Sequence, residues 1–136
     1  HGRANGAFLI TTMEFNAGVP RKITPHSTYP MYVVGKKYLR AALFLGLPMT
    51  PGANGKISEE QAVLALKRAV YDLLVTIGQP TSISELGIPQ ADITSKMPEL
   101  VQAAYEDLSV RTSARAPLFY EITELFETAY ARRERP

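Results

Sequence analysis

The stretch from Ser58 to Gly78 constrains the fold more than any other part of the chain. It opens on Ser58, with Gln61 three residues later, which is the pattern of a capping box at a helix N-terminus. Gly78 follows the last apolar residue, at the position where helices commonly end on a glycine in the left-handed conformation. The stretch therefore predicts a long helix over 59–77, which we expect at the centre of the core. Its apolar residues recur at helical spacing, at Val63, Leu64, Leu66, Val70, Leu73, Leu74 and Ile77.

Helical patterns also account for the rest of the chain. Stop signals divide it at Gly18-Val19-Pro20, at Gly46-Leu47-Pro48 and at Met97-Pro98, where we expect a break or a new first turn. After this break we expect a helix with Leu108 facing inward. No segment alternates apolar and polar residues over the length of a strand. The sequence thus predicts an all-α fold, an antiparallel helical domain of about five to six helices, with helical segments at 2–16, 30–45, 59–77, 80–87, 99–108 and 117–130.

The first of these segments has the weakest helical pattern. Residues 2–16 carry apolar side chains near helical spacing, but Gly6 and two threonines lower the helix propensity. Gly2 and Gly6 have no side chain, so we expect that another backbone or a ligand can approach the helix closely at these positions.

Composition and charge exclude several partners. The chain has 15 Lys and Arg against 13 Asp and Glu, spread along the helices, whereas a nucleic-acid-binding domain usually has a basic face. Its one basic cluster, Arg132-Arg133-Glu134-Arg135, is expected to be a solvated helix end. No apolar run approaches the roughly 20 residues that span a membrane. The absence of cysteine fits a reducing compartment, so we expect a cytoplasmic protein without disulfides.

Metal chemistry in this chain can involve only two histidines, His1 and His26. Neither belongs to a His-x3-His or Glu-x-x-His pattern, so the residues alone do not assemble a metal site. His26 stands beside Pro25 among turn residues, where a surface histidine is the simpler interpretation. The 136 residues suffice for one domain, and a start at His1 without a methionine indicates a piece of a longer polypeptide.

Several short motifs occur in an order that is more specific than any one of them. The chain opens on His1-Gly2 with Asn5, followed by an apolar run and Met13-x-Phe15-Asn16. This succession resembles the C-terminal helical portion of the iron-containing (group III) alcohol dehydrogenases, a dehydroquinate synthase-like fold, over nearly the whole chain. The later matching motifs are Tyr38 with Ala42 and Leu45-Gly46, the segment 77–88, Ala103-Ala104-Tyr105-Glu106-Asp107, and Ser113-Ala114-Arg115, which stands where many members have Asn-Pro-Arg.

The resemblance implies a metal centre shared with residues outside this chain. In that family His1 would be the last of four ligands, at the start of a helix. The other three, an Asp, a His four residues later and a further His, precede the matching stretch, as does a dinucleotide-binding domain with a Gly-rich loop. We therefore expect residues 1–136 to be the C-terminal part of the helical metal-binding domain. Its partner would be the N-terminal dinucleotide-binding domain of the same parent chain.

The resemblance also implies a function. The parent enzyme would interconvert a small alcohol and an aldehyde or ketone by hydride transfer with NAD or NADP, using Fe²⁺ or Zn²⁺, as a homo-oligomer. The fragment alone would be inactive. Asn5, one helical turn after His1, and Ser109 are candidates for the substrate pocket, and Asn5 could orient a group there. A surface or capping residue is the alternative for Asn5, and a loop serine is the alternative for Ser109.

A second hypothesis comes from a different class of protein. The chain could be a non-catalytic helical interaction module derived from the same family. This sequence does not contain the other three metal ligands or the nucleotide-binding domain, and their absence favours that hypothesis. The gene sequence before His1 would discriminate between the two.

Overall fold

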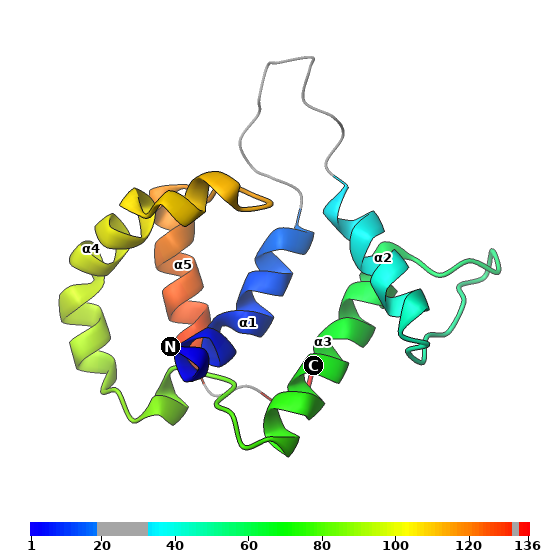
Figure 1. Ribbon diagram of the computed structural model, residues 1–136, viewed down its shortest axis with the longest axis horizontal. Coiled ribbons are helices and arrows are strands. Elements are labelled where there is room, and N and C mark those ends of the chain that lie inside the picture. The colour runs from blue at the N-terminus through cyan, green and yellow to red at the C-terminus, as the bar shows by residue number, and fades with distance from the viewer. Residues whose placement is uncertain (19–32, 132–133) are drawn as a thin grey trace, which may run out of the picture.

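Helices account for all the regular structure that is described. The computed structural model describes residues 1–18, 33–131 and 134–136, and these ranges contain five α-helices, two 3-10 helices and no strand. The all-α prediction is therefore confirmed. The elements are α1 (Gly2–Ala17), α2 (Val34–Phe44), α3 (Glu59–Thr76), η1 (Ser84–Leu86), α4 (Gln90–Glu106), η2 (Leu108–Thr112) and α5 (Phe119–Tyr130) (Figure 1).

The start of α3 is stabilised by the two residues that predicted it. The Gln61 N–H donates to Ser58 Oγ at 3.2 Å, and the Ser58 N–H donates to Gln61 Oε1 at 2.9 Å. At the other end Gly78 has a φ of +67°, in the left-handed region that glycine adopts without a steric cost. The predicted capping box is thus confirmed, and the helix ends within one residue of the predicted position.

α1, and not α3, is the central helix. α1 contacts α2, α3, α5 and η1, whereas α3 packs chiefly on α1 and α2 (Figure 1). The expectation that the helix over 59–77 lies at the centre is therefore wrong. α1 has no single apolar stripe, because it is buried from two sides. Small residues such as Gly6 and Ala7, both buried, allow its neighbours to approach closely.

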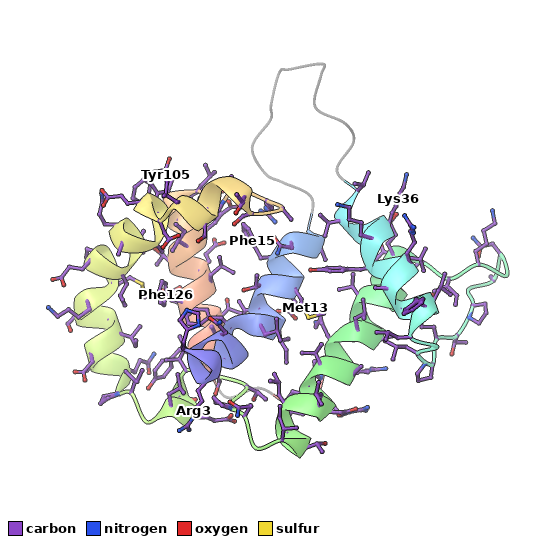
Figure 2. All side chains as sticks on the ribbon, viewed as in Figure 1. Arg3, Met13, Phe15, Lys36, Tyr105 and Phe126 are labelled. Atoms are coloured by element: carbon purple, nitrogen blue, oxygen red, sulfur yellow. The ribbon has the colours of Figure 1, made fainter. Side chains whose placement is uncertain are left out.

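Two apolar clusters flank α1. On the α5 side, the rings of Phe8 and Phe126 meet edge to face with their centroids 5.2 Å apart. On the other side, Met13 packs against residues of α2 and α3. Figure 2 shows Phe126 and Met13 on either side of α1, so this helix joins the two halves of the core. The buried members are Ala7, Ile83 and Ala129 in the first cluster and Ala42, Ala62 and Leu66 in the second.

α4 runs through the position where the sequence predicts a break. It contains Pro98 in its interior. Proline removes one helical hydrogen bond, here the bond to the Thr94 carbonyl, but both residues are exposed and water can reach that carbonyl. The predicted break at Met97-Pro98 is therefore wrong. The predicted inward position of Leu108 is also wrong, because the chain leaves α4 after Glu106 and Leu108 is 72% exposed.

Some predictions fall outside the described residues. These are the surface histidine His26, the helix start at Pro30, and the Arg132 and Arg133 part of the basic cluster. α2 begins at Val34, directly after its N-cap residue Val33. Among the described helices, none combines the length and the apolar character that crossing a bilayer would require.

Candidate metal centre

His1 stands at the N-cap of α1 and is exposed. Residues 1–5 are all exposed, whereas Gly6 begins the buried part of the helix. A Cβ atom built on Gly2 would have no atom of the described residues within 4 Å. Figure 2 shows Arg3 extending from this same turn. The first turn of α1 therefore presents the imidazole at an open surface.

The side chain of Asn5 lies against the His1 ring. Asn5 Nδ2 is 3.2 Å from His1 Nδ1, because residues four apart in a helix share one face. An amide nitrogen can only donate, so Nδ1 accepts, and the neutral ring then carries its proton on Nε2. The structure thus brings together two of the predicted site residues.

Close packing one turn later fixes this end of α1. A Cβ atom on Gly6 would lie 3.2 Å from the Pro80 carbonyl oxygen, so the helix and the segment before η1 are nearly in backbone contact. That segment is joined to α5, because the Ile83 N–H donates to the Ala129 carbonyl at 2.8 Å. Of the two glycines expected to allow close approach, Gly6 does so within the described structure, and Gly2 borders open space.

The described residues offer one imidazole ligand and not a complete set. Within residues 1–18, 33–131 and 134–136, no group of three or more His, Cys, Asp or Glu side chains could hold a metal ion. His1 itself suits the role, because imidazole nitrogen binds both iron and zinc. Its ring is exposed, and Asn5 contacts Nδ1 and not Nε2. Among the described residues, His1 can therefore offer one ligand, through Nε2, and these residues do not complete a metal site around it.

Ser109 lies far from His1 and Asn5. It belongs to η2, where its N–H donates to Asp107 Oδ1 at 2.7 Å, and hydrogen bonds from Ser109 lower the pKa of the Asp107 carboxyl. η2 lies at the end of the molecule where α1 ends, and α1 is about 24 Å long at 1.5 Å per residue (Figure 1). The structure does not bring Ser109 to the His1 end.

Arg115 closes the opposite end of α1, a role that the sequence motif around it did not reveal. Its guanidinium forms an ion pair with Glu121, donates to the Phe15 carbonyl at 2.8 Å and lies 3.9 Å from the centre of the Phe15 ring. Glu121 also accepts from the Leu118 N–H at 2.9 Å, at the start of α5. Both charged side chains are buried. The pair therefore joins two helix ends that are distant in sequence.

Comparison with known proteins identifies the family. The family model described as the C-terminal region of the Fe-containing alcohol dehydrogenases matches residues 1–130, from His1 to the end of α5. Because this match covers nearly the whole chain, the chain belongs to that family. Its helices fit the all-α C-terminal domain of these proteins, which confirms the resemblance seen in the motifs.

Its relatives are much longer proteins. An aldehyde-alcohol dehydrogenase of Streptococcus pneumoniae is 31% identical over 137 residues, which cover 100% of this chain and 15% of that protein. The 1-propanol dehydrogenase PduQ of Salmonella typhimurium is 30% identical over 127 residues, 93% of this chain and 30% of that protein. Lactaldehyde reductase of Escherichia coli is 28% identical over 130 residues, 96% of this chain and 28% of that protein. The chain thus spans less than a third of the length of these relatives.

Proposed function

We propose that the chain is the C-terminal part of the metal-binding helical domain of an NAD(P)-linked alcohol dehydrogenase. The parent protein would interconvert a small alcohol and an aldehyde or ketone. The observation that carries the proposal is the family match over residues 1–130, together with the exposed position of the His1 imidazole on α1. The names of the relatives, among them a 1-propanol dehydrogenase and a lactaldehyde reductase, support the same chemistry.

In this proposal the chain supplies one ligand on a rigid support. His1 would offer Nε2 to a site completed by an Asp and two His residues from the preceding part of the parent chain. A divalent cation there, Fe²⁺ or Zn²⁺, would polarise the alcohol oxygen and favour loss of its proton as hydride passes to NAD or NADP. The close packing of Gly6 against the Pro80 carbonyl fixes the backbone of α1 about one turn after His1.

The two pocket candidates differ in their support. Asn5 contacts the Nδ1 side of the His1 ring, so it lies next to the proposed ligand, and its place in the substrate pocket remains a prediction. Ser109 remains a prediction, because it belongs to η2, at the other end of α1 from His1 (Figure 1).

Metal analysis of the complete parent protein tests the ligand assignment. His1→Ala should lose most of the bound metal, because a catalytic site of this kind depends on each of its few protein ligands. His26→Ala is the matched control, since it removes the other histidine of this chain and should leave the metal content unchanged. Full metal content in His1→Ala would contradict the proposal.

The isolated chain is expected to be inactive. It should bind neither NAD nor NADP by calorimetry, and it should not reduce either dinucleotide when an alcohol is added. The complete parent protein should do both under the same conditions. Turnover by residues 1–136 alone would overturn this division of the enzyme.

The alternative is a non-catalytic helical interaction module from the same family. Exposed apolar side chains at the end of α2, with Phe44 90% exposed, favour it, since such patches often mark protein interfaces. The gene sequence that precedes His1 discriminates. An Asp-x3-His motif and a Gly-rich nucleotide-binding loop in the same reading frame favour the enzyme, and a frame without them favours the module.

Two further properties belong to the proposal. A cytoplasmic location agrees with the absence of cysteine, since proteins of reducing compartments rarely rely on disulfides. A homo-oligomeric parent protein is expected from the family resemblance. Cell fractionation and light scattering of the parent protein test these two expectations.

A further inference from the structure

Within the described part of the chain, the His1 ring contacts one polar side-chain group. This group is the carboxamide of Asn5. Its Nδ2 lies 3.2 Å from His1 Nδ1. Both side chains are exposed, so burial does not hold the amide in one orientation. In the orientation seen here the amide donates, Nδ1 accepts, and the proton of the neutral ring sits on Nε2.

Metal binding through Nε2 requires the opposite arrangement. A nitrogen that binds a cation carries no proton, so the proton of the neutral ring must move to Nδ1, which then needs an acceptor. A carboxamide has a donor and an acceptor of nearly equal size. A half-turn of the Asn5 amide places Oδ1 where Nδ2 now lies, and the contact with Nδ1 is kept with its direction reversed.

The backbone of α1 is well placed to hold this partner. Asn5 immediately precedes Gly6, whose close contact with the Pro80 carbonyl fixes the helix at that point. The Asn5 N–H also donates to the His1 carbonyl at 3.0 Å, so both residues belong to one ordered helical turn. The amide is therefore anchored to the packed part of the helix, while the imidazole lies at its open end.

We propose that Asn5 is the positioning residue of His1. Its amide turns over when Nε2 binds a divalent cation, so that Oδ1 accepts the Nδ1 proton and fixes both the tautomer and the orientation of the ring. The ring remains neutral, because its proton leaves Nε2 and returns on Nδ1 through solvent. This inference rests on the proposed function, in which His1 is a ligand, and assigns Asn5 to the support of the metal site.

Release of zinc from the complete parent protein tests this role. The protein is loaded with Zn²⁺ and mixed with an excess of chelator, and the rate of zinc loss is followed with a metal-sensitive dye. Asn5→Leu has a similar shape but no hydrogen-bonding group, and it should lose zinc about 10- to 100-fold faster. Asn5→Asp keeps an acceptor for Nδ1 and should retain zinc as well as the unchanged protein does.

A matched control separates this role from a general effect of altering α1. Arg3→Leu introduces the same residue into the same exposed turn and should leave the rate of zinc loss unchanged. Equal acceleration in Arg3→Leu and Asn5→Leu would overturn the proposal. Faster zinc loss in Asn5→Asp, as fast as in Asn5→Leu, would also overturn it, because the acceptor would then be irrelevant.

The tautomer of His1 gives a second readout that a purely structural role would not change. In zinc-loaded protein labelled with ¹⁵N at histidine, Nδ1 of His1 should carry a proton that exchanges slowly in the unchanged protein and in Asn5→Asp. In Asn5→Leu this proton should exchange rapidly with water. Equal exchange in all three proteins would contradict the proposal.

The outcomes distinguish this inference from the proposed function. If His1→Ala keeps its zinc, His1 is not a ligand, and both ideas fail. If His1→Ala loses its zinc while Asn5→Leu releases zinc within about twofold of the normal rate, only the role of Asn5 fails.

Discussion

The two ends of α1 differ in almost every physical respect. At its start, residues 1–5 are exposed, and the His1 ring contacts only its own helical turn among the described residues. At its end, Arg115 is buried and joins the helix to the start of α5. Figure 2 shows Phe15 and Arg3 at these two ends. The closed end contributes to stability, whereas the open end has groups available for a ligand or for other parts of a larger protein.

At the closed end of α1, one ion pair supplies hydrogen-bond partners to the backbone of two helices. The last carbonyls of a helix lack intrahelical donors, and the first N–H groups lack acceptors. Arg115 donates to the Phe15 carbonyl near the end of α1, and Glu121 accepts from the Leu118 N–H at the start of α5. Each charge also has the sign that the helix dipole favours at its position.

The largest effect on stability is expected from breaking the closed end. Arg115→Ala would leave Glu121 as a buried charge without its partner, and it should lower the free energy of unfolding by about 3–5 kcal/mol. Urea unfolding followed by circular dichroism measures this change. The double replacement of Arg115→Met with Glu121→Leu should lower the free energy of unfolding much less, because it leaves no buried charge without a partner. A loss below about 1 kcal/mol in Arg115→Ala would show that the two ends are less different than the structure indicates.

A smaller loss is expected where the open end meets the packed part of the helix. In Gly6→Val the new side chain would meet the Pro80 carbonyl oxygen, which lies 3.2 Å from the position of a Cβ atom. We expect a loss of about 1–3 kcal/mol, because a backbone atom cannot move away easily. Gly2→Val, with no described atom within 4 Å, is the matched control for the helix propensity of valine. Equal losses in the two variants would contradict the close contact.

A surface ion pair should contribute less to stability than the two contacts above, and it should do so only above acidic pH. Arg135 contacts both carboxylate oxygens of Asp72 at 2.7 Å, and this hydrogen bonding lowers the pKa of Asp72. Because the pKa is lower in the folded state, the stabilisation is present above the unfolded pKa and is lost as pH falls through the folded value. At neutral pH the melting temperature of Arg135→Ala should therefore be slightly lower than that of the unchanged protein. In acid the two melting temperatures should be equal. Melting curves over a pH series measure this, and a difference that persists in acid would contradict the assignment.

The smallest effect on stability is expected at the open end itself. His1→Ala should change the free energy of unfolding of this chain by no more than about 0.5 kcal/mol, because the side chain is exposed and its polar contact among the described residues is the one with Asn5. The same substitution should remove metal from the complete parent protein. Denaturant unfolding of the chain and metal analysis of the parent protein give the two halves of this comparison. A large loss of stability would mean that His1 has a structural role.

Much of the fold was predictable because its signals are local. The capping box of Ser58 and Gln61 and the left-handed Gly78 depend on residues a few positions apart, and the structure contains both. The contact of Asn5 with His1 is of the same kind, since it follows from helical spacing alone. The break predicted at Pro98 failed because an exposed carbonyl can be hydrated, and solvent exposure is not a local property.

By itself, the sequence determined the all-α class, the family to which the chain belongs, and a histidine at the start of its first helix. These depend on residue order, spacing and capping, which act within a few turns of chain. Only the tertiary structure decided that α1 is the central helix and that Arg115 joins it to Glu121. It also decided that His1 remains exposed and that Ser109 lies at the other end. These features depend on which surfaces meet after the chain has folded, and no short stretch of sequence specifies that.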